Sequence, residues 1–424
     1  MSFKFSKIIK DSPFSRNVMT LMTGSFVAQS IPVAISPILT RLYTPEEFGV
    51  LALFVTISTI LSVLVTARYE QAILLPEKEL EAIHITKLCL VIALIMSVGF
   101  LILIMLFHDW IVDFFNEPTL SFWLYFIPVV TLSVGVFNAL NYYFLRHKKF
   151  KSIASSEVYK SSFSGAFQLV LGLLKEGVLG LLLGKIVSVL IAPIYLWRKT
   201  DFSLVYFSFT DLKIVARRYI GFSKYMMWGS LFNNLSNYAT QLLIPVFYST
   251  NLLGFFALVF RVMGAPYTFI SQSVGQVFIE EAVREKKVNG HAKVIVKKVF
   301  WQLTALSAFG FGGAYFFLEE LFALVFGEEW RVAGSYAKYM LPFFMIKFIV
   351  SPLTNIHAVF EVLKLSFVLQ LIMLALSISC IIYAHFSSIE FEEFLILFSG
   401  VLSLFYLIRL YIIWKIANNQ LVEK

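Results

Sequence analysis

Three basic side chains lie inside long apolar stretches of the sequence, where a charge is costly. Lys185, Arg261 and Lys347 each stand well within a run of mostly apolar residues. An ionised side chain at mid-bilayer costs at least ~3 kcal/mol when it faces lipid, so we expect these residues to face protein or a water-filled cavity. Snorkelling or a purely structural hydrogen bond is the alternative, and snorkelling fits Lys185 best because it lies nearest the end of its span.

The acidic residues offer no partner at the same depth. All 26 Asp and Glu residues fall in predicted loops or at span ends, and Glu70, Glu157, Glu280 and Glu281 are expected at cytoplasmic ends. A cavity with uncompensated positive charge attracts an anion, and the planar fork of arginine suits phosphate oxygens. The sequence therefore predicts an anionic substrate that is large enough to need a whole helix bundle.

Amide side chains recur at three- and four-residue intervals, which places them on single helix faces. They are Asn138 and Asn141 in one span, Asn234, Asn237 and Gln241 in another, and Gln272 and Gln276 on the span of Arg261. In a cavity these amides would bind sugar hydroxyls. Hydrogen bonding between helices is about as common a use of any single such residue, so both uses stay open.

Motifs for catalysis or metal binding are missing from the sequence. It contains no HExxH, CxxC or GxxxxGK[ST] pattern, and its six histidines have no ligand spacing. Cys89 and Cys380 both fall in apolar spans, which suggests neither a disulfide nor a metal site. No loop is long enough to fold as a catalytic domain. We therefore expect a protein that is not an enzyme and that has no metal and no cofactor.

The composition is that of a membrane protein. Hydrophobic residues make up 59% of the chain and charged residues only 14%, against roughly 25% charge in an average soluble domain. The opening residues MSFKFSKIIKDS lack an apolar core and a cleavage site, so we expect no removable signal peptide. The net charge of +9 lies in short loops, as membrane topology requires, and this argues against a nucleic-acid partner.

Twelve stretches are long and apolar enough to span a bilayer as helices. They are 17–40, 47–67, 83–107, 120–145, 154–174, 177–197, 219–243, 251–279, 294–318, 332–358, 364–386 and 393–416. With these spans most Lys and Arg residues, including Lys87 and Arg409, are assigned to one side of the membrane. Because cytoplasmic loops collect Lys and Arg, both termini are predicted to be cytoplasmic.

The sequence also repeats itself. Phe14-Ser15-Arg16 and Pro37 return as Phe222-Ser223-Lys224 and Pro245 at the same spacing. Such a match indicates two copies of one unit, residues 1–210 and 211–424. An even number of spans per copy gives both copies the same orientation, related by a pseudo-two-fold axis along the membrane normal. The predicted fold class is therefore all-α integral membrane, with twelve transmembrane helices in two six-helix lobes.

Four segments carry a resemblance to a known family: GSFVAQSIPVAISPILTRLYTPEEFGVLALF, TARYEQAILLP, LGFFALVFRVMGAPYTFISQSVGQVF and LPFFMIKFIVSPLTNI. They resemble the bacterial polysaccharide-biosynthesis exporters, the O-antigen (Wzx-type) flippases of the multidrug/oligosaccharidyl-lipid/polysaccharide (MOP) superfamily. The resemblance implies a MATE-like arrangement of two lobes around a central cavity, in the bacterial inner membrane. It also implies that an undecaprenyl-pyrophosphate-linked oligosaccharide is moved from the cytoplasmic to the periplasmic leaflet.

The resemblance bears on single residues as well. In the related lipid II flippase, arginines in the first, second and eighth helices meet the pyrophosphate, and here only Arg261 matches by helix and depth. Arg16, Arg41 and Arg68 stand at the ends of the first two spans, so they are weaker matches.

We therefore predict a lipid-linked oligosaccharide flippase that works by alternating access. Arg261 and Lys347 would hold the pyrophosphate, assisted by Lys185. Arg68 would capture it at the cytoplasmic mouth, Arg41 would act at the exit, and the amides would line the route of the sugar. A polysaccharide polymerase and a chain-length regulator are candidate partners. Two alternatives stay open: a drug/cation antiporter of the same superfamily, which needs a deep carboxylate, and an intramembrane glycosyl polymerase, which needs a large external loop.

Overall fold

The chain folds into helices throughout the part that a computed structural model describes, residues 13–200 and 208–420. It divides into two compact units, Met1–Asn234 and Leu235–Lys424. The division falls within helix α10 (Met227–Phe247), beyond the boundary after residue 210 that the sequence repeat indicates. The predicted all-α fold class is confirmed.

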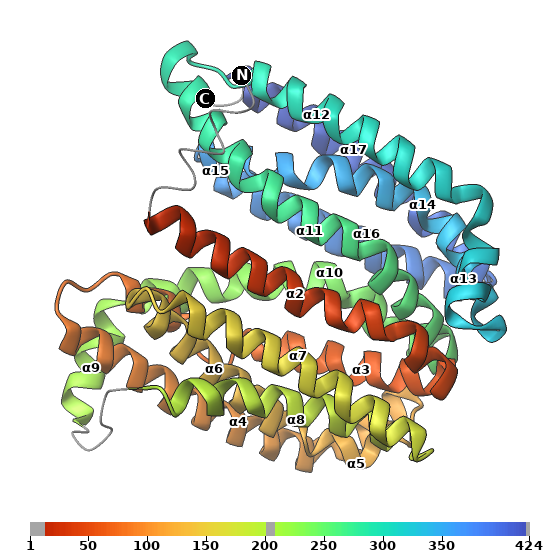
Figure 1. Cartoon of the computed structure of the whole chain (residues 1–424), viewed down its shortest axis with the longest axis horizontal. Helices are drawn as coiled ribbons and strands as arrows, with labels where there is room; N and C mark the ends of the chain where they lie inside the picture. Colours follow the sequence, from red (N-terminus) through yellow and green to blue (C-terminus); the bar gives the residue numbers. More distant parts are fainter. Residues whose placement is uncertain (1–12, 201–207, 421–424) are drawn as a thin grey trace. The chain divides into compact units, whose positions relative to one another are not determined.

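The helices of each unit follow one another along the chain with short connections (Figure 1). Those before α10 are α2 (Pro13–Leu42), α3 (Pro45–Ser62), η1 (Tyr69–Leu74), α4 (Glu79–Phe115), α5 (Leu120–Leu124), α6 (Ile127–Arg146), α7 (Phe150–Leu173), α8 (Val178–Trp197), α9 (Phe209–Arg218) and η2 (Phe222–Met226). Those after it are α11 (Thr250–Asn289), α12 (Lys293–Ser307), η3 (Ala308–Gly312), η4 (Tyr315–Phe317), α13 (Leu318–Phe326), η5 (Glu328–Trp330), α14 (Arg331–Leu353), α15 (Ile356–Val359), α16 (Leu363–Phe386) and α17 (Phe391–Ala417).

Within the described ranges, nine helical segments are long and apolar enough to cross a membrane. Each of the twelve predicted spans overlaps one helix or a run of consecutive helical segments. The three that do not reach the same length and hydropathy are α7, α10 and α11, of which α11 is counted as apolar over Thr250–Pro266. The protein is therefore a multi-pass membrane protein, and the number of twelve membrane helices stays a prediction.

The sequence repeat corresponds to an elbow that each unit contains. Tyr43 and Thr44 join α2 to α3, and Tyr248 and Ser249 join α10 to α11. Thr44 Oγ1 accepts a hydrogen bond from the amide of Glu47 at 3.3 Å, and Ser249 Oγ accepts one from the amide of Leu252 at 3.2 Å. Both hydroxyls therefore cap a helix N-terminus, where the first turn leaves amides without a partner.

The elbow tyrosines fix each turn to a distant segment of the same unit. The Tyr43 hydroxyl donates to the carbonyl of Gln168 in α7 at 2.6 Å, and the Tyr248 hydroxyl donates to the carbonyl of Ile389 before α17 at 3.2 Å. Burial, helped by the Glu47 carboxylate, raises the pKa of Tyr43 to about 12. Its phenol therefore stays protonated and remains a donor at physiological pH.

Small residues let α2, α7 and α8 approach closely. A Cβ added at Gly24 of α2 would collide with Ala154 of α7, and one added at Gly184 of α8 would lie 2.6 Å from Cγ of Gln168 in α7. Membrane helices depend on such close backbone packing, since lipid supplies no hydrophobic drive between them. These glycines therefore hold three helices of the first unit together.

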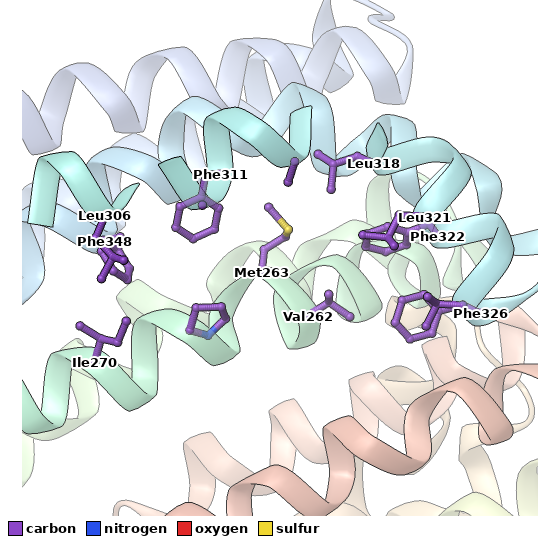
Figure 2. A pocket seen from close by; sticks show the side chains of 14 residues that line it. Val262, Met263, Ile270, Leu306, Phe311, Leu318, Leu321, Phe322, Phe326 and Phe348 are labelled. Carbon is purple, nitrogen blue, oxygen red and sulfur yellow. The ribbon is translucent and has the colours of Figure 1, made fainter. Parts of the chain in front are cut away.

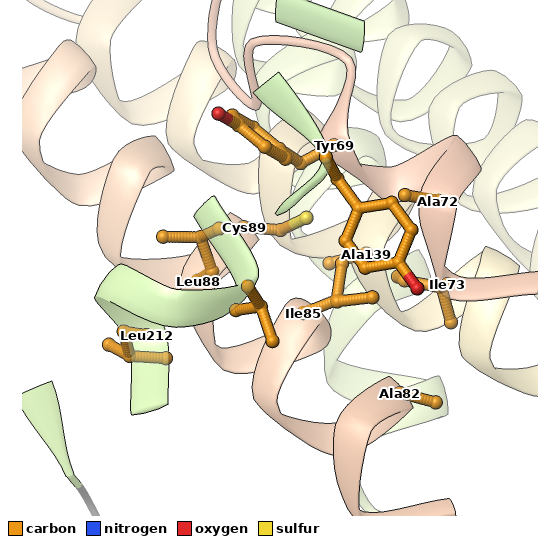
Figure 3. Close-up of a cluster of buried hydrophobic side chains, with 11 residues drawn as sticks. Tyr69, Ala72, Ile73, Ala82, Ile85, Leu88, Cys89, Ala139 and Leu212 are labelled. Atoms are coloured by element: carbon orange, nitrogen blue, oxygen red, sulfur yellow. The ribbon is translucent and has the colours of Figure 1, made fainter. Parts of the chain in front are cut away.

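A buried cluster explains why the chain beyond residue 210 belongs to the first unit. Tyr69 and Ile73 of η1 and Ile85 of α4 belong to one cluster with Leu212 of α9 (Figure 3). Val215 of α9 is part of the same cluster. The Tyr69 hydroxyl also donates to the carbonyl of Ala216 at 3.0 Å. Helix α9 thus contributes to the core of the first unit, although the repeat assigns it to the second copy.

Aromatic rings form much of the core of the second unit. Phe343 of α14 lies 6.2 Å from Phe260 of α11 and 6.1 Å from Phe398 of α17, measured between ring centroids. Phe256 of α11 lies 6.4 Å from Phe398. These contacts fix α11, α14 and α17 relative to one another.

Candidate functional site

Two of the predicted cations flank one aromatic contact in the second unit. Arg261 is half-buried on α11 and directly follows Phe260, whose ring lies 5.1 Å from that of Phe344 on α14. Lys347 is half-buried one turn further along α14, and its ammonium lies 5.2 Å from the centroid of Phe343. Both positive charges thus belong to the α11–α14 packing and lie inside helices of the membrane region.

A further cation of the second unit lies on α17. Arg409 is half-buried two turns before the end of that helix, and its charge repels that of Lys347. Helix α17 packs on α14, with Tyr406 5.9 Å from Phe343 between ring centroids. Assigning Arg409 to a cytoplasmic loop was wrong, although the predicted span 393–416 contains it. Like charges brought together in a medium of low dielectric raise the local positive potential and favour an anion.

A buried histidine lies beside this group. His357 of α15 is 2% exposed and feels the positive charge of Arg409. Its Nδ1 hydrogen bonds with the carbonyl of Thr354 at 2.7 Å, where Nδ1 must be the donor, and its buried Nε2 has no hydrogen-bond partner in the described structure. In neutral imidazole this leaves Nε2 as an acceptor. Nothing in the sequence pattern singled out this residue.

The amide stripes have mixed environments. In α10, Asn234 Nδ2 donates to the carbonyl of Ser230 at 2.9 Å, Asn237 is exposed and Gln241 is half-buried. In α11, Gln276 is exposed, and the side chain of Gln272 lies outside the described residues. The Asn234 bond stays within its own helix, and whether the stripes contact a sugar stays a prediction.

Arg68 of the first unit belongs to a buried polar cluster. Its Nη1 lies 3.4 Å from Oε1 of Glu70, and the Thr66 hydroxyl donates to Oε2 of Glu70 at 2.6 Å. Glu70 is only 1% exposed. The carboxylate that the sequence predicts at the end of a span is therefore buried inside the protein. Nε of Arg68 and Oδ1 of Asn141 are buried without a hydrogen-bond partner among the described residues.

The backbone at this cluster is strained. Ala67 and Arg68 have φ of +47° and +63°, in the left-handed region that non-glycine residues rarely adopt. The two residues directly precede η1, in which Glu70 is buried. Strain of this kind persists where surrounding contacts enforce it, and it occurs often at functional sites.

The remaining predicted residues are on different helices of the first unit. Lys185 on α8 and Asn138 on α6 are half-buried, and Arg41 is exposed in the last turn of α2. Lys87, which the loop assignment placed on the cytoplasmic surface, is instead 4% exposed inside α4. Among the described residues, no group of three or more His, Cys, Asp or Glu side chains could hold a metal ion.

A family model described as polysaccharide biosynthesis protein matches residues 38–335. The chain belongs to this polysaccharide biosynthesis family. No curated protein sequence matches the chain.

The fold of this polysaccharide biosynthesis protein is that of known membrane transporters. The lipid II flippase MurJ in an inward closed conformation matches with a TM-score of 0.71 and 12% identity, over 96% of this chain and 90% of MurJ. An inward-facing multidrug resistance MATE family transporter of the MOP superfamily matches with a TM-score of 0.58 and 13% identity, over 95% of this chain and 94% of the transporter. A MOP superfamily transporter from Pyrococcus furiosus matches with a TM-score of 0.52 and 15% identity, over 99% of this chain and 98% of that transporter. The family match confirms the predicted resemblance to polysaccharide-biosynthesis proteins, and these structures confirm the predicted MATE-like fold.

Proposed function

We propose that the protein is a flippase that moves a pyrophosphate-linked oligosaccharide on a polyprenyl carrier, an O-antigen or capsule repeat unit, to the periplasmic leaflet. The observation that carries this proposal is the pair of positive charges, Lys347 and Arg409, that α14 and α17 bring together in the membrane region, with Arg261 on the adjoining helix α11. Family membership in polysaccharide biosynthesis supplies the class of substrate. The proposal includes the bacterial inner membrane, cytoplasmic termini and no catalytic step.

Each part of such a substrate has a matching group in the chain. The pyrophosphate carries the negative charge that the three cations attract, and arginine can bind two of its oxygens at once. Asn237, Gln241 and Gln276 would bind sugar hydroxyls as the head group passes. Lys185, Arg68 and Arg41 are proposed as auxiliary contacts along the route. The two units, 1–210 and 211–424 in the repeat, would alternate access to the two membrane faces.

The test uses vesicles that contain the purified protein and a pyrophosphate-linked oligosaccharide. Hydrogen bonds to charged groups contribute about 1.5–3 kcal/mol, so Arg261→Ala and Lys347→Ala should each slow translocation roughly tenfold to hundredfold. Lys347→Arg keeps the charge and should retain most of the activity. Arg284→Ala is the matched control, since it removes an arginine from the same helix whose side chain is 69% exposed. Wild-type rates in the two alanine variants would remove this site from the mechanism.

A drug/cation antiporter remains the second candidate, because Glu70 is a buried carboxylate of the kind that such a transporter needs. The same vesicles distinguish the two functions. Uptake of a cationic dye that Glu70→Gln abolishes, with no movement of the oligosaccharide, would favour the antiporter. Translocation without growth of the sugar chain would exclude a glycosyl polymerase.

A further inference from the structure

An apolar groove runs along α11 in the second unit. It encloses about 410 Å³ and is lined only by apolar residues of α11, α14 and the segment from α12 to α13. Figure 2 shows Ile270 and Leu306 toward one end, Met263 and Phe311 between, and Phe326 at the other end. Leu306 and Leu321 remain 47% and 45% exposed. The groove is thus apolar and partly exposed, and one of its walls lies in the candidate membrane span Lys293–Phe326.

One wall of the groove is a widened helical turn rich in small residues. The segment Ala308–Gly312 is a π-helix, a rare conformation that is frequent at functional sites. Gly310 and Ala314 contribute to the lining, and a Cβ added at Gly310 would meet nothing within 4 Å. The ring of Phe311 packs on Phe348 of α14 at 5.6 Å between centroids. The glycine leaves space that a side chain would otherwise fill.

Arg261 and the groove lie on different faces of helix α11. Val262, Pro266 and Ile270 recur every four residues and so share the face that lines the groove. Arg261 precedes Val262 and therefore lies at the same depth but on a different face. An amphiphile with an anionic head and an apolar chain matches this arrangement, with its head beside Arg261 and its chain in the groove.

We infer that the groove binds the polyprenyl chain of the transported lipid. This inference rests on the proposed function, because the proposed substrate carries both the anionic head group and the apolar chain. The prenyl chain enters the groove from bilayer hydrocarbon and not from water, so its binding depends on packing against the lining. Methyl-branched prenyl units can pack against the aromatic rings and branched side chains of the lining.

The test uses the full-length protein in nanodiscs of zwitterionic phospholipid and a polyprenyl pyrophosphate with a diazirine in its tail. After illumination, mass spectrometry should find label in peptides covering 262–270 and 306–326. Gly310→Phe should fill the groove and lower this labelling about tenfold, which corresponds to 1.4 kcal/mol. Gly313→Phe is the matched control, because a Cβ there also meets nothing within 4 Å but Gly313 does not line the groove.

Two results would overturn the inference. One is label outside the groove, or label that Gly310→Phe leaves unchanged. The other is equal, Gly310-dependent labelling by a phospholipid with a diazirine in its acyl chain, which would make the groove an ordinary site for bilayer lipid. A neutral polyprenol probe separates this question from transport. If this probe labels the groove while wild-type vesicles move no oligosaccharide, the groove binds polyprenyl chains but the proposed function is wrong.

Discussion

At the scale of single residues, Glu70 and Arg68 differ in how they can respond to loss of their partner. Glu70 is 1% exposed in its side chain, whereas Arg68 is 23% exposed. A carboxylate left alone in such a position keeps an uncompensated buried charge, which costs about 3–5 kcal/mol. The guanidinium, by contrast, can turn toward solvent, so the two single substitutions should have unequal effects.

We therefore predict that Arg68→Ala lowers thermal stability much more than Glu70→Gln. Gln keeps an oxygen that can accept from the Thr66 hydroxyl, which now lies 2.6 Å from the carboxylate. The double variant should recover most of the loss, with a coupling of about 1–3 kcal/mol. Melting in detergent, followed by the fluorescence of intrinsic tryptophan, measures all three. If Arg68→Ala melted at the wild-type temperature, Arg68 would not be needed to compensate the charge of Glu70, and the prediction would be wrong.

Charges within apolar runs are visible in a sequence, and this is why residue type and position are enough to single out Arg261 and Lys347. Their neighbours in space are not visible in the same way. Arg409 comes near Lys347 only because α17 packs on α14. Glu70 is buried next to a left-handed turn at Ala67 and Arg68. Lateral packing and backbone strain of this kind leave no mark in residue spacing.

At the scale of helices, the same added methyl group should have opposite effects at two glycines. Gly24 of α2 has no room, since its Cβ would collide with Cβ of Ala154 in α7. Gly99 of α4 has nothing within 4 Å of an added Cβ. Alanine is favoured over glycine inside a helix by up to about 1 kcal/mol, whereas overpacking costs about 1–3 kcal/mol.

Gly24→Ala should therefore destabilise the protein and Gly99→Ala should leave it equal or slightly more stable. Thermal melting of both variants in the same detergent provides the comparison. The direction of the Gly24 effect tests the α2–α7 contact, because helix propensity alone predicts a gain at both positions. A gain at Gly24 would mean that these helices pack less closely than described.

Elements were more predictable than their boundaries. Every predicted span overlaps one helix or a run of helical segments, because apolar runs of this length have few other structures in a membrane. The repeated segment includes an elbow in each unit, and the structure shows that Thr44 and Ser249 cap the helices that follow. It could not show that α9 packs into the core of the first unit, because Leu212 and Val215 meet Ile85 only in the folded chain.

At the scale of the whole molecule, the number of membrane crossings decides the topology, and three helices leave it open. Within the described ranges nine segments qualify by length and hydropathy, while α7, α10 and α11 do not. Polar residues at intervals in α7 and α10 lower their hydropathy. Polar residues are expected where transporter helices line an aqueous route. Their free-energy cost there is lower than in contact with lipid.

We predict that α7, α10 and α11 all cross the membrane, and single cysteines can test this. Cys89 and Cys380 are free but buried, so they should react little with a membrane-impermeant maleimide. Lys151→Cys and Asn289→Cys should react only from the cytoplasmic side, and Glu176→Cys and Asn251→Cys only from the periplasmic side. All four positions are exposed. If the two ends of α7 reacted from the same side, the twelve-helix topology would be wrong, and with it the matching orientation of the two repeats.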